Sequence, residues 1–177
     1  MKKFTKALLL IVLTSLLFIT GCKKESSDTS ENSMLTVGDT NYELSQAYLD
    51  YDLSGHSTNS TIYLLSSSIT NTLGANYFSG TGTMVTFYFH PTVAGTIEGT
   101  FPYSASSYVN SFTYCDFYLN YNDQQGTYTS NTNANDGTIK ITKNGSGFEI
   151  IILSTAFSVT YHGPVVNLSD GTNVTTK

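Results

Sequence analysis

The sequence predicts an all-β domain, built either as a single antiparallel β-sandwich or as a small β-barrel. Of the 177 residues, 13 are Tyr and 10 are Phe, and these residues, together with the abundant Thr, favour strands. From about residue 35 onward, apolar residues recur at every second position, and no long stripe of period 3.6 predicts a helix. Sandwiches and barrels both alternate inward and outward positions, so the pattern leaves these two architectures open.

The expected strands follow one another at short intervals, with turn signals between them. The Asn-Gly-Ser-Gly run at 144–147 supplies residues that tolerate the positive φ of a tight hairpin. Pro91 and Pro164 are expected to end strands, because proline cannot donate a ladder hydrogen bond. In chain order, the expected strands comprise residues 42–53, 61–65, 84–90, 96–103, 114–121, 139–142, 148–153 and 157–161.

Alternation within these strands predicts which side chains are buried. Phe87 and Phe89 share one face of their strand, and Cys115 is in phase with Phe117 on another. Cys115 is therefore expected to be a small buried residue without a redox or catalytic role. The strand 148–153 carries apolar residues on both faces, so we expect both of its faces to be covered.

Residues 1–21 read as an N-terminal leader. Its lysines precede a mostly apolar run that is too short for a comfortable membrane span, which indicates a secretory signal. The run ends at Ile19-Thr20-Gly21-Cys22, which resembles the lipobox of bacterial lipoproteins. The resemblance implies that Cys22 becomes the lipidated N-terminus and anchors the protein to a membrane. With that thiol lipidated, the one remaining cysteine has no disulfide partner in the chain.

Residues 22–34 are expected to form a flexible polar tether, followed by an all-β domain over residues 35–177. A Lys-rich, then Ser- and Asp-containing stretch after the cysteine resembles the tethers of lipoproteins from the Bacteroidetes. In that group a short acidic signal can direct export to the cell surface, and Glu25 and Asp28 match it in part. The resemblance implies a lipid-anchored protein of the bacterial outer membrane, and it leaves open whether the domain faces the periplasm or the cell surface.

The domain itself also resembles small Bacteroidetes lipoproteins. Residues 136–152 hold a G-T-I-K-I strand, an Asn-Gly turn and an F-E-I-I-I strand, which precede a closing Tyr161-His162-Gly163. Gly99-Thr100-Phe101 matches an earlier element of that group, and residues 42–53 resemble its opening strand. The resemblance covers residues 36–166. It implies an all-β fold in a group mostly of unknown function, and it transfers no catalytic residues.

Composition and motifs disfavour several classes of function. With a net charge of -5 and no Arg, the chain lacks the basic stripe that nucleic-acid binding requires. His56, His90 and His162 lack the spacing of a structural metal site and are expected to be exposed at loops or strand ends. Asp50 and Asp52 share a strand face at a separation that glycosidases use, but a solvated face explains them better. We therefore expect no enzymatic activity, no cofactor and no metal.

Tyrosines are the remaining sequence feature that suggests a function. Tyr88, Tyr114 and Tyr118 are out of phase with their apolar neighbours, which predicts an outward-facing row. Such a row offers rigid rings with polar tips, which suit sugar rings or a protein partner. The first hypothesis is a membrane-anchored envelope or cell-surface lipoprotein whose non-catalytic domain binds a glycan or a partner protein.

Two alternatives stay open. A calycin-like carrier of a small hydrophobic ligand would need a barrel whose interior is lined by side chains such as Phe87, Phe117 and Ile150. A hydrolase would need a site assembled in space that no local motif reveals. The C-terminal residues 165–177 are a candidate for an edge strand, or for a strand donated to a partner.

Overall fold

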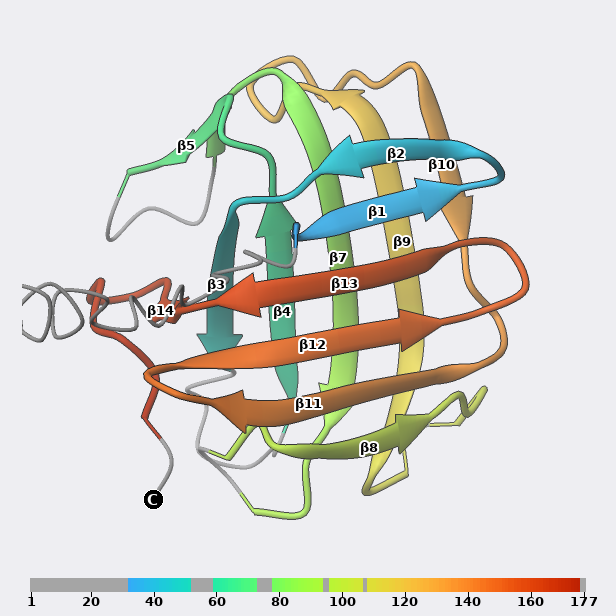
Figure 1. Cartoon of the computed structure of the whole chain (residues 1–177), viewed down its shortest axis with the longest axis vertical. Coiled ribbons are helices and arrows are strands. Elements are labelled where there is room, and N and C mark those ends of the chain that lie inside the picture. The colour runs from blue at the N-terminus through green and yellow to red at the C-terminus, as the bar shows by residue number, and fades with distance from the viewer. Residues whose placement is uncertain (1–31, 52–58, 73–77, 94–95, 107, 176–177) are drawn as a thin grey trace, which may run out of the picture. The chain divides into compact units, whose positions relative to one another are not determined.

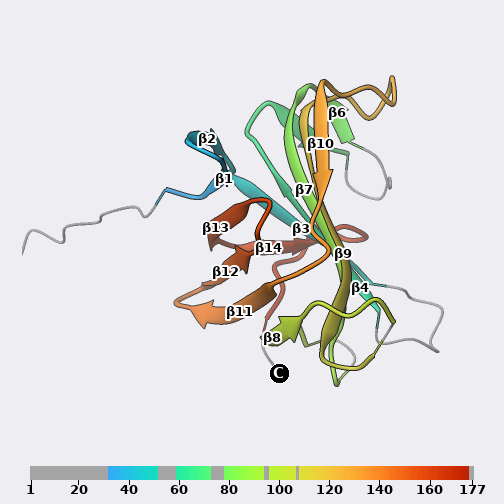
Figure 2. The ribbon, with the colours of Figure 1, turned by 90° about the vertical axis from the view of Figure 1, so that its right-hand side faces the viewer.

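The protein folds as a β-sandwich of two six-stranded sheets, seen face-on in Figure 1 and from the side in Figure 2. The structure is a computed structural model, and it describes residues 32–51, 59–72, 78–93, 96–106 and 108–175. No helix that could cross a membrane occurs among these residues. The all-β prediction is confirmed, and the sandwich is the correct alternative because neither sheet closes on itself.

The first sheet consists of antiparallel neighbours throughout. Its central hairpin is the one that the sequence predicts, with Asn144 opposite Gly147 and a positive φ of 58° at Gly145. In spatial order the strands are β2 (Thr40–Glu43), β1 (Met34–Val37), β13 (Ser158–Gly163), β12 (Gly147–Leu153), β11 (Thr138–Asn144) and β8 (Gly99–Pro102).

The second sheet contains one pair that departs from the antiparallel pattern. Its edge strand β14 runs parallel to β3, with Val165 opposite Ala47. Only Pro164 separates β14 from β13, so the chain passes there directly from one sheet to the other. In spatial order the strands are β10 (Ser130–Asn133), β9 (Ser111–Tyr121), β7 (Gly82–His90), β4 (Ser60–Leu65), β3 (Gln46–Tyr51) and β14 (Val165–Asn167).

A small third sheet covers part of the outer side of the second sheet. Its strands β5 (Ile69–Asn71) and β6 (Phe78–Gly80) lie between β4 and β7 in the sequence, where the alternation predicts no strand. Ile69 and Phe78 pack with Leu65, Met84 and Leu168 in a buried cluster separate from the main core. This cap covers Leu65 and Met84 on the outer face, whereas Tyr114 on the same face is 36% exposed.

Two sequence predictions about strands require correction. The single strand expected over residues 42–53 is two strands, β2 and β3, because the chain crosses between the sheets at Leu44 and Ser45. Ser45 donates a backbone hydrogen bond to Leu65 of the second sheet at 2.8 Å, while β2 pairs in the first. The outer face of β12 is not covered as expected, since Leu153 is 59% exposed.

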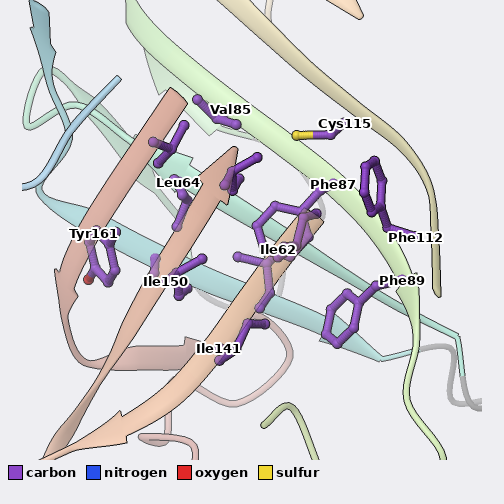
Figure 3. Packing of buried hydrophobic residues seen from close by; sticks show 14 of the residues in the cluster. Ile62, Leu64, Val85, Phe87, Phe89, Phe112, Cys115, Ile141, Ile150 and Tyr161 are labelled. Atoms are coloured by element: carbon purple, nitrogen blue, oxygen red, sulfur yellow. The ribbon is translucent and has the colours of Figure 1, made fainter. Parts of the chain in front are cut away.

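The main core lies between the two sheets, where their inward side chains meet (Figure 3). Phe89 of the second sheet packs edge-on against Phe101 of the first, with ring centroids 4.9 Å apart. The side chains that a carrier would use to line a cavity are buried in this packed layer: Phe87, Phe117 and Ile150. These contacts hold the two sheets together. They also fix the strands of the second sheet, and with them the side chains on its outer face.

Cys115 belongs to this core, as its alternation predicts. Its side chain is fully buried opposite Phe87, and its thiol forms no disulfide. Burial, with a smaller effect from the charge of Asp116, holds the pKa of the thiol well above its ordinary value. A buried neutral thiol is a poor nucleophile, so the environment of Cys115 is that of a packing residue.

Candidate functional site

The tyrosines that the sequence singles out lie on the outer face of the second sheet. Tyr88 on β7 is directly opposite Tyr114 on β9, and their rings stack with centroids 5.6 Å apart and planes 4° from parallel. Tyr114 is 36% exposed, whereas Tyr88 and Tyr118 are half-buried. Both strands send their intervening residues inward, so alternation alone brings these rings to one side.

Strand register adds residues from β4 to this group. Thr61 is opposite Tyr88, and its side chain hydrogen-bonds that of Tyr114. Tyr63 is opposite Thr86, and Thr86 is opposite Asp116, so three strands place one row across the sheet. We call the resulting surface the tyrosine face, and its members are Thr61, Tyr63, Tyr88, Tyr114, Asp116 and Tyr118.

Hydrogen bonds fix the polar groups at the β9 side of the tyrosine face. The Tyr118 hydroxyl donates to Asp116 Oδ2 at 3.3 Å, and the Asn133 side-chain amide donates to Asp116 Oδ1. The Tyr118 ring also packs against Tyr121 and Tyr128, with centroids 5.5 and 5.3 Å away. Such contacts restrict the rotamers of these side chains and reduce the entropy that a ligand would have to remove.

The phenol groups of Tyr63, Tyr114 and Tyr118 are neutral under physiological conditions. Burial, together with the charge of Asp50 and other neighbours, raises the pKa of Tyr63 to about 12. Burial and the adjacent Asp116 likewise raise the pKa of Tyr118 to about 12. Burial also raises the pKa of Tyr114, although its hydrogen bond with Thr61 opposes the shift. The hydroxyls are therefore available as hydrogen-bond donors and acceptors.

His90 borders the tyrosine face and is buried, which corrects the expectation of an exposed strand-end histidine. Only 4% of its surface is exposed, because the Tyr88 ring packs edge-on against it at 4.9 Å and the Asn59 side chain covers its Nδ1. Nδ1 lies 2.6 Å from Asn59 Oδ1, whereas Nε2 is buried and has no hydrogen-bond partner among the described residues. Burial holds the pKa of His90 below its ordinary value of 6.5.

Replacing His90 with Gln is expected to weaken the pH dependence of stability. Below pH 6.5, His90 of the unfolded chain binds a proton that His90 of the folded protein does not bind. The stability of the wild type therefore falls as the pH falls towards the pKa of His90 in the folded protein. The stability that the wild type loses on acidification is fully present above pH 6.5, and His90→Gln lacks this pH-dependent contribution. Urea unfolding at a series of pH values should give the variant a shallower loss on acidification, and parallel curves would contradict this account.

The structure describes only some of the other residues considered from the sequence. Asp50 lies on the outer side of β3, opposite Thr61, while Asp52, His56 and Cys22 lie outside the described residues. His162 is half-buried on β13 in the first sheet. In the part of the chain that the structure describes, no three His, Cys, Asp or Glu side chains are grouped as metal ligands would be.

No protein-family model, curated protein or solved structure matches the chain.

Sequence reasoning named only part of the tyrosine face. Tyr63 is out of phase with Ile62 and Leu64, so the signal that found Tyr88 could also have found it. The position of Asp116 between tyrosines was visible in the sequence, but its place beside β4 residues depends on strand pairing.

Proposed function

We propose that this protein is a lipid-anchored, non-catalytic component of the bacterial envelope that binds a glycan through its tyrosine face. The observation that carries the proposal is the stacked pair of Tyr88 and Tyr114 on the outer face of the second sheet, where Tyr114 is 36% exposed. Hydrogen-bonding groups of Thr61 and Asp116 lie directly beside this pair.

A sugar ring has a chemistry that matches this surface. Its C–H groups form an apolar face that packs on aromatic rings, while its hydroxyls need hydrogen-bond partners around the edge. The tyrosines supply both rings and neutral hydroxyls, and the Asp116 carboxylate supplies strong acceptors. The hydrogen-bonded sheet holds these groups in fixed positions, so little order must be created on binding.

The surroundings favour a glycan over a protein partner. The centre of a protein interface is usually an apolar patch depleted of charge. On this face the aliphatic side chains are buried in the cluster with the β5–β6 cap, and the part beside the cap combines partly exposed aromatic rings with Thr and Asp side chains. A surface that is aromatic and polar together, with its aliphatic groups hidden, suits hydroxyl-rich ligands.

The proposed anchor rests on the leader and its cysteine. Lys-rich residues, an apolar run and Ile19-Thr20-Gly21-Cys22 occur in the order that a lipoprotein signal requires. A polar tether before β1, which begins at Met34, would let the domain stand away from the lipid surface. An outer-membrane lipoprotein placed in this way would present its tyrosine face to envelope or environmental polysaccharides.

Alanine substitution at Tyr114 tests glycan binding. In an array of oligosaccharides followed by titration calorimetry, we expect Tyr114→Ala to weaken the affinity of the best ligand about tenfold or more, equal to about 1.4 kcal/mol or more. Leu153→Ala, which removes an exposed side chain from the opposite sheet, is the control and should bind like the wild type. Equal affinities for the wild type and Tyr114→Ala would exclude the tyrosine face as the site.

A further inference from the structure

Charged side chains are distributed unequally between the two sheets. The described residues include only two cations of Lys or Arg type, Lys140 and Lys143, and both lie on β11 of the first sheet. The second sheet carries Asp50 and Asp116, with Asp123 directly after β9, and none of its described residues is Lys or Arg. The tyrosine face therefore lies in a region of negative potential.

Two of these carboxylates, Asp116 and Asp123, accept hydrogen bonds from neutral groups. Asp116 accepts hydrogen bonds from Tyr118 and Asn133, neither of which carries a charge. Asp123 accepts one from the Tyr121 hydroxyl at 2.5 Å and one from the backbone N–H of Phe78 at 3.0 Å. These partners orient the carboxylates and leave their negative charge uncompensated within the described residues.

A ligand would experience this charge together with the aromatic rings. An ammonium group gains from a nearby carboxylate and also from the negative face of a tyrosine ring. A carboxylate or sulfate group on the ligand would be repelled by both, and the surface offers no guanidinium or ammonium to receive it. An uncharged sugar would gain only ring packing and hydrogen bonds.

We propose that the glycan bound by the tyrosine face carries free amino groups, and that acidic glycans are rejected. This inference rests on the proposed glycan-binding function and adds the chemical class of the ligand. Asp116 is the group that selects for charge, because it lies between Tyr114 and Tyr118 on the same side of β9. The tyrosines provide affinity for the sugar ring itself.

Oligomers that differ in the sign of their charge provide the test. The full chain is titrated in slightly acidic buffer with a glucosamine hexamer, its N-acetylated counterpart and a galacturonate oligomer, so that free amines are protonated and uronates are ionised. We expect the glucosamine hexamer to bind about threefold or more tighter than the acetylated one, and the galacturonate oligomer to show no binding. The preference should shrink in high salt, because exposed charges are screened.

Asp116→Asn keeps a similar shape and removes the charge. We expect Asp116→Asn to weaken binding of the glucosamine hexamer more than binding of the acetylated hexamer, so that the preference for the free amine is lost. Equal binding of both hexamers by the wild type, or a preference that survives in Asp116→Asn, would overturn the charge selection and leave glycan binding intact. If no oligomer binds the wild type more tightly than Tyr114→Ala, the proposed function itself fails.

Discussion

Phe89→Ala is expected to lower the free energy of unfolding by about 3–5 kcal/mol, a large part of the roughly 5–15 kcal/mol typical of a single domain. Phe89 is fully buried on the second sheet, and its ring meets Phe101 of the first sheet edge-on. It also packs against Phe87, with centroids 5.6 Å apart. Truncation would remove apolar burial and open a cavity at a contact that joins the sheets.

Urea unfolding of the wild type and two variants measures this effect. The matched control is Leu153→Ala, because Leu153 is apolar but 59% exposed, and its truncation should change stability by no more than about 0.5 kcal/mol. The midpoint of Phe89→Ala should fall with little change in slope if unfolding stays cooperative. A loss below about 1 kcal/mol would mean that the Phe89 side chain does not join the two sheets as the structure has it.

Cys22→Ala is expected to abolish membrane attachment. If the Cys22 sulfur carries lipid, each buried CH₂ contributes about 0.8 kcal/mol, and the several acyl chains of a lipoprotein make a stable anchor. Removal of that single sulfur removes the whole contribution. We expect wild-type protein expressed in a bacterial host to incorporate labelled palmitate and enter the detergent phase, and Cys22→Ala to do neither.

Cys115→Ala is the control for this experiment, because Cys115 is the chain's other cysteine and lies buried in the core. Lipid incorporation should be unchanged in Cys115→Ala. Label retained in Cys22→Ala, or lost in Cys115→Ala, would reject Cys22 as the attachment point. Either result would also remove the support for placing the domain at an envelope membrane.

The candidate site was predictable in part because side-chain alternation is local. Tyr88 and Tyr114 are out of phase with buried Phe87 and Cys115, so their outward direction follows from the strand geometry of their own segments. Their stacking does not follow, since it requires that β7 and β9 be neighbours in a particular register. A slip of one residue would have opposed each tyrosine to an inward position.

His90 and the β5–β6 cap show where local reasoning fails. His90 stands at a strand end before a proline, which suggests exposure, yet a residue more than 30 positions away in the sequence, Asn59, hydrogen-bonds it. The cap depends on Phe78 reaching the outer cluster beside Leu65 and Met84. Both features depend on contacts between different segments of the chain. The residue pattern of neither segment predicts which other segment it contacts.

The sequence by itself determined that the domain is all-β, that Cys115, Phe87 and Phe89 lie inward, and that Tyr88, Tyr114 and Tyr118 lie outward. It did so because each of these properties depends on the period-two geometry of single strands. Only the tertiary structure decided between sandwich and barrel, made β14 a parallel edge strand, and placed Tyr63 and Asp116 in one row across three strands. Strands with similar alternation can pair in many orders, and the order is selected by the joint packing of both sheets, which no single segment encodes.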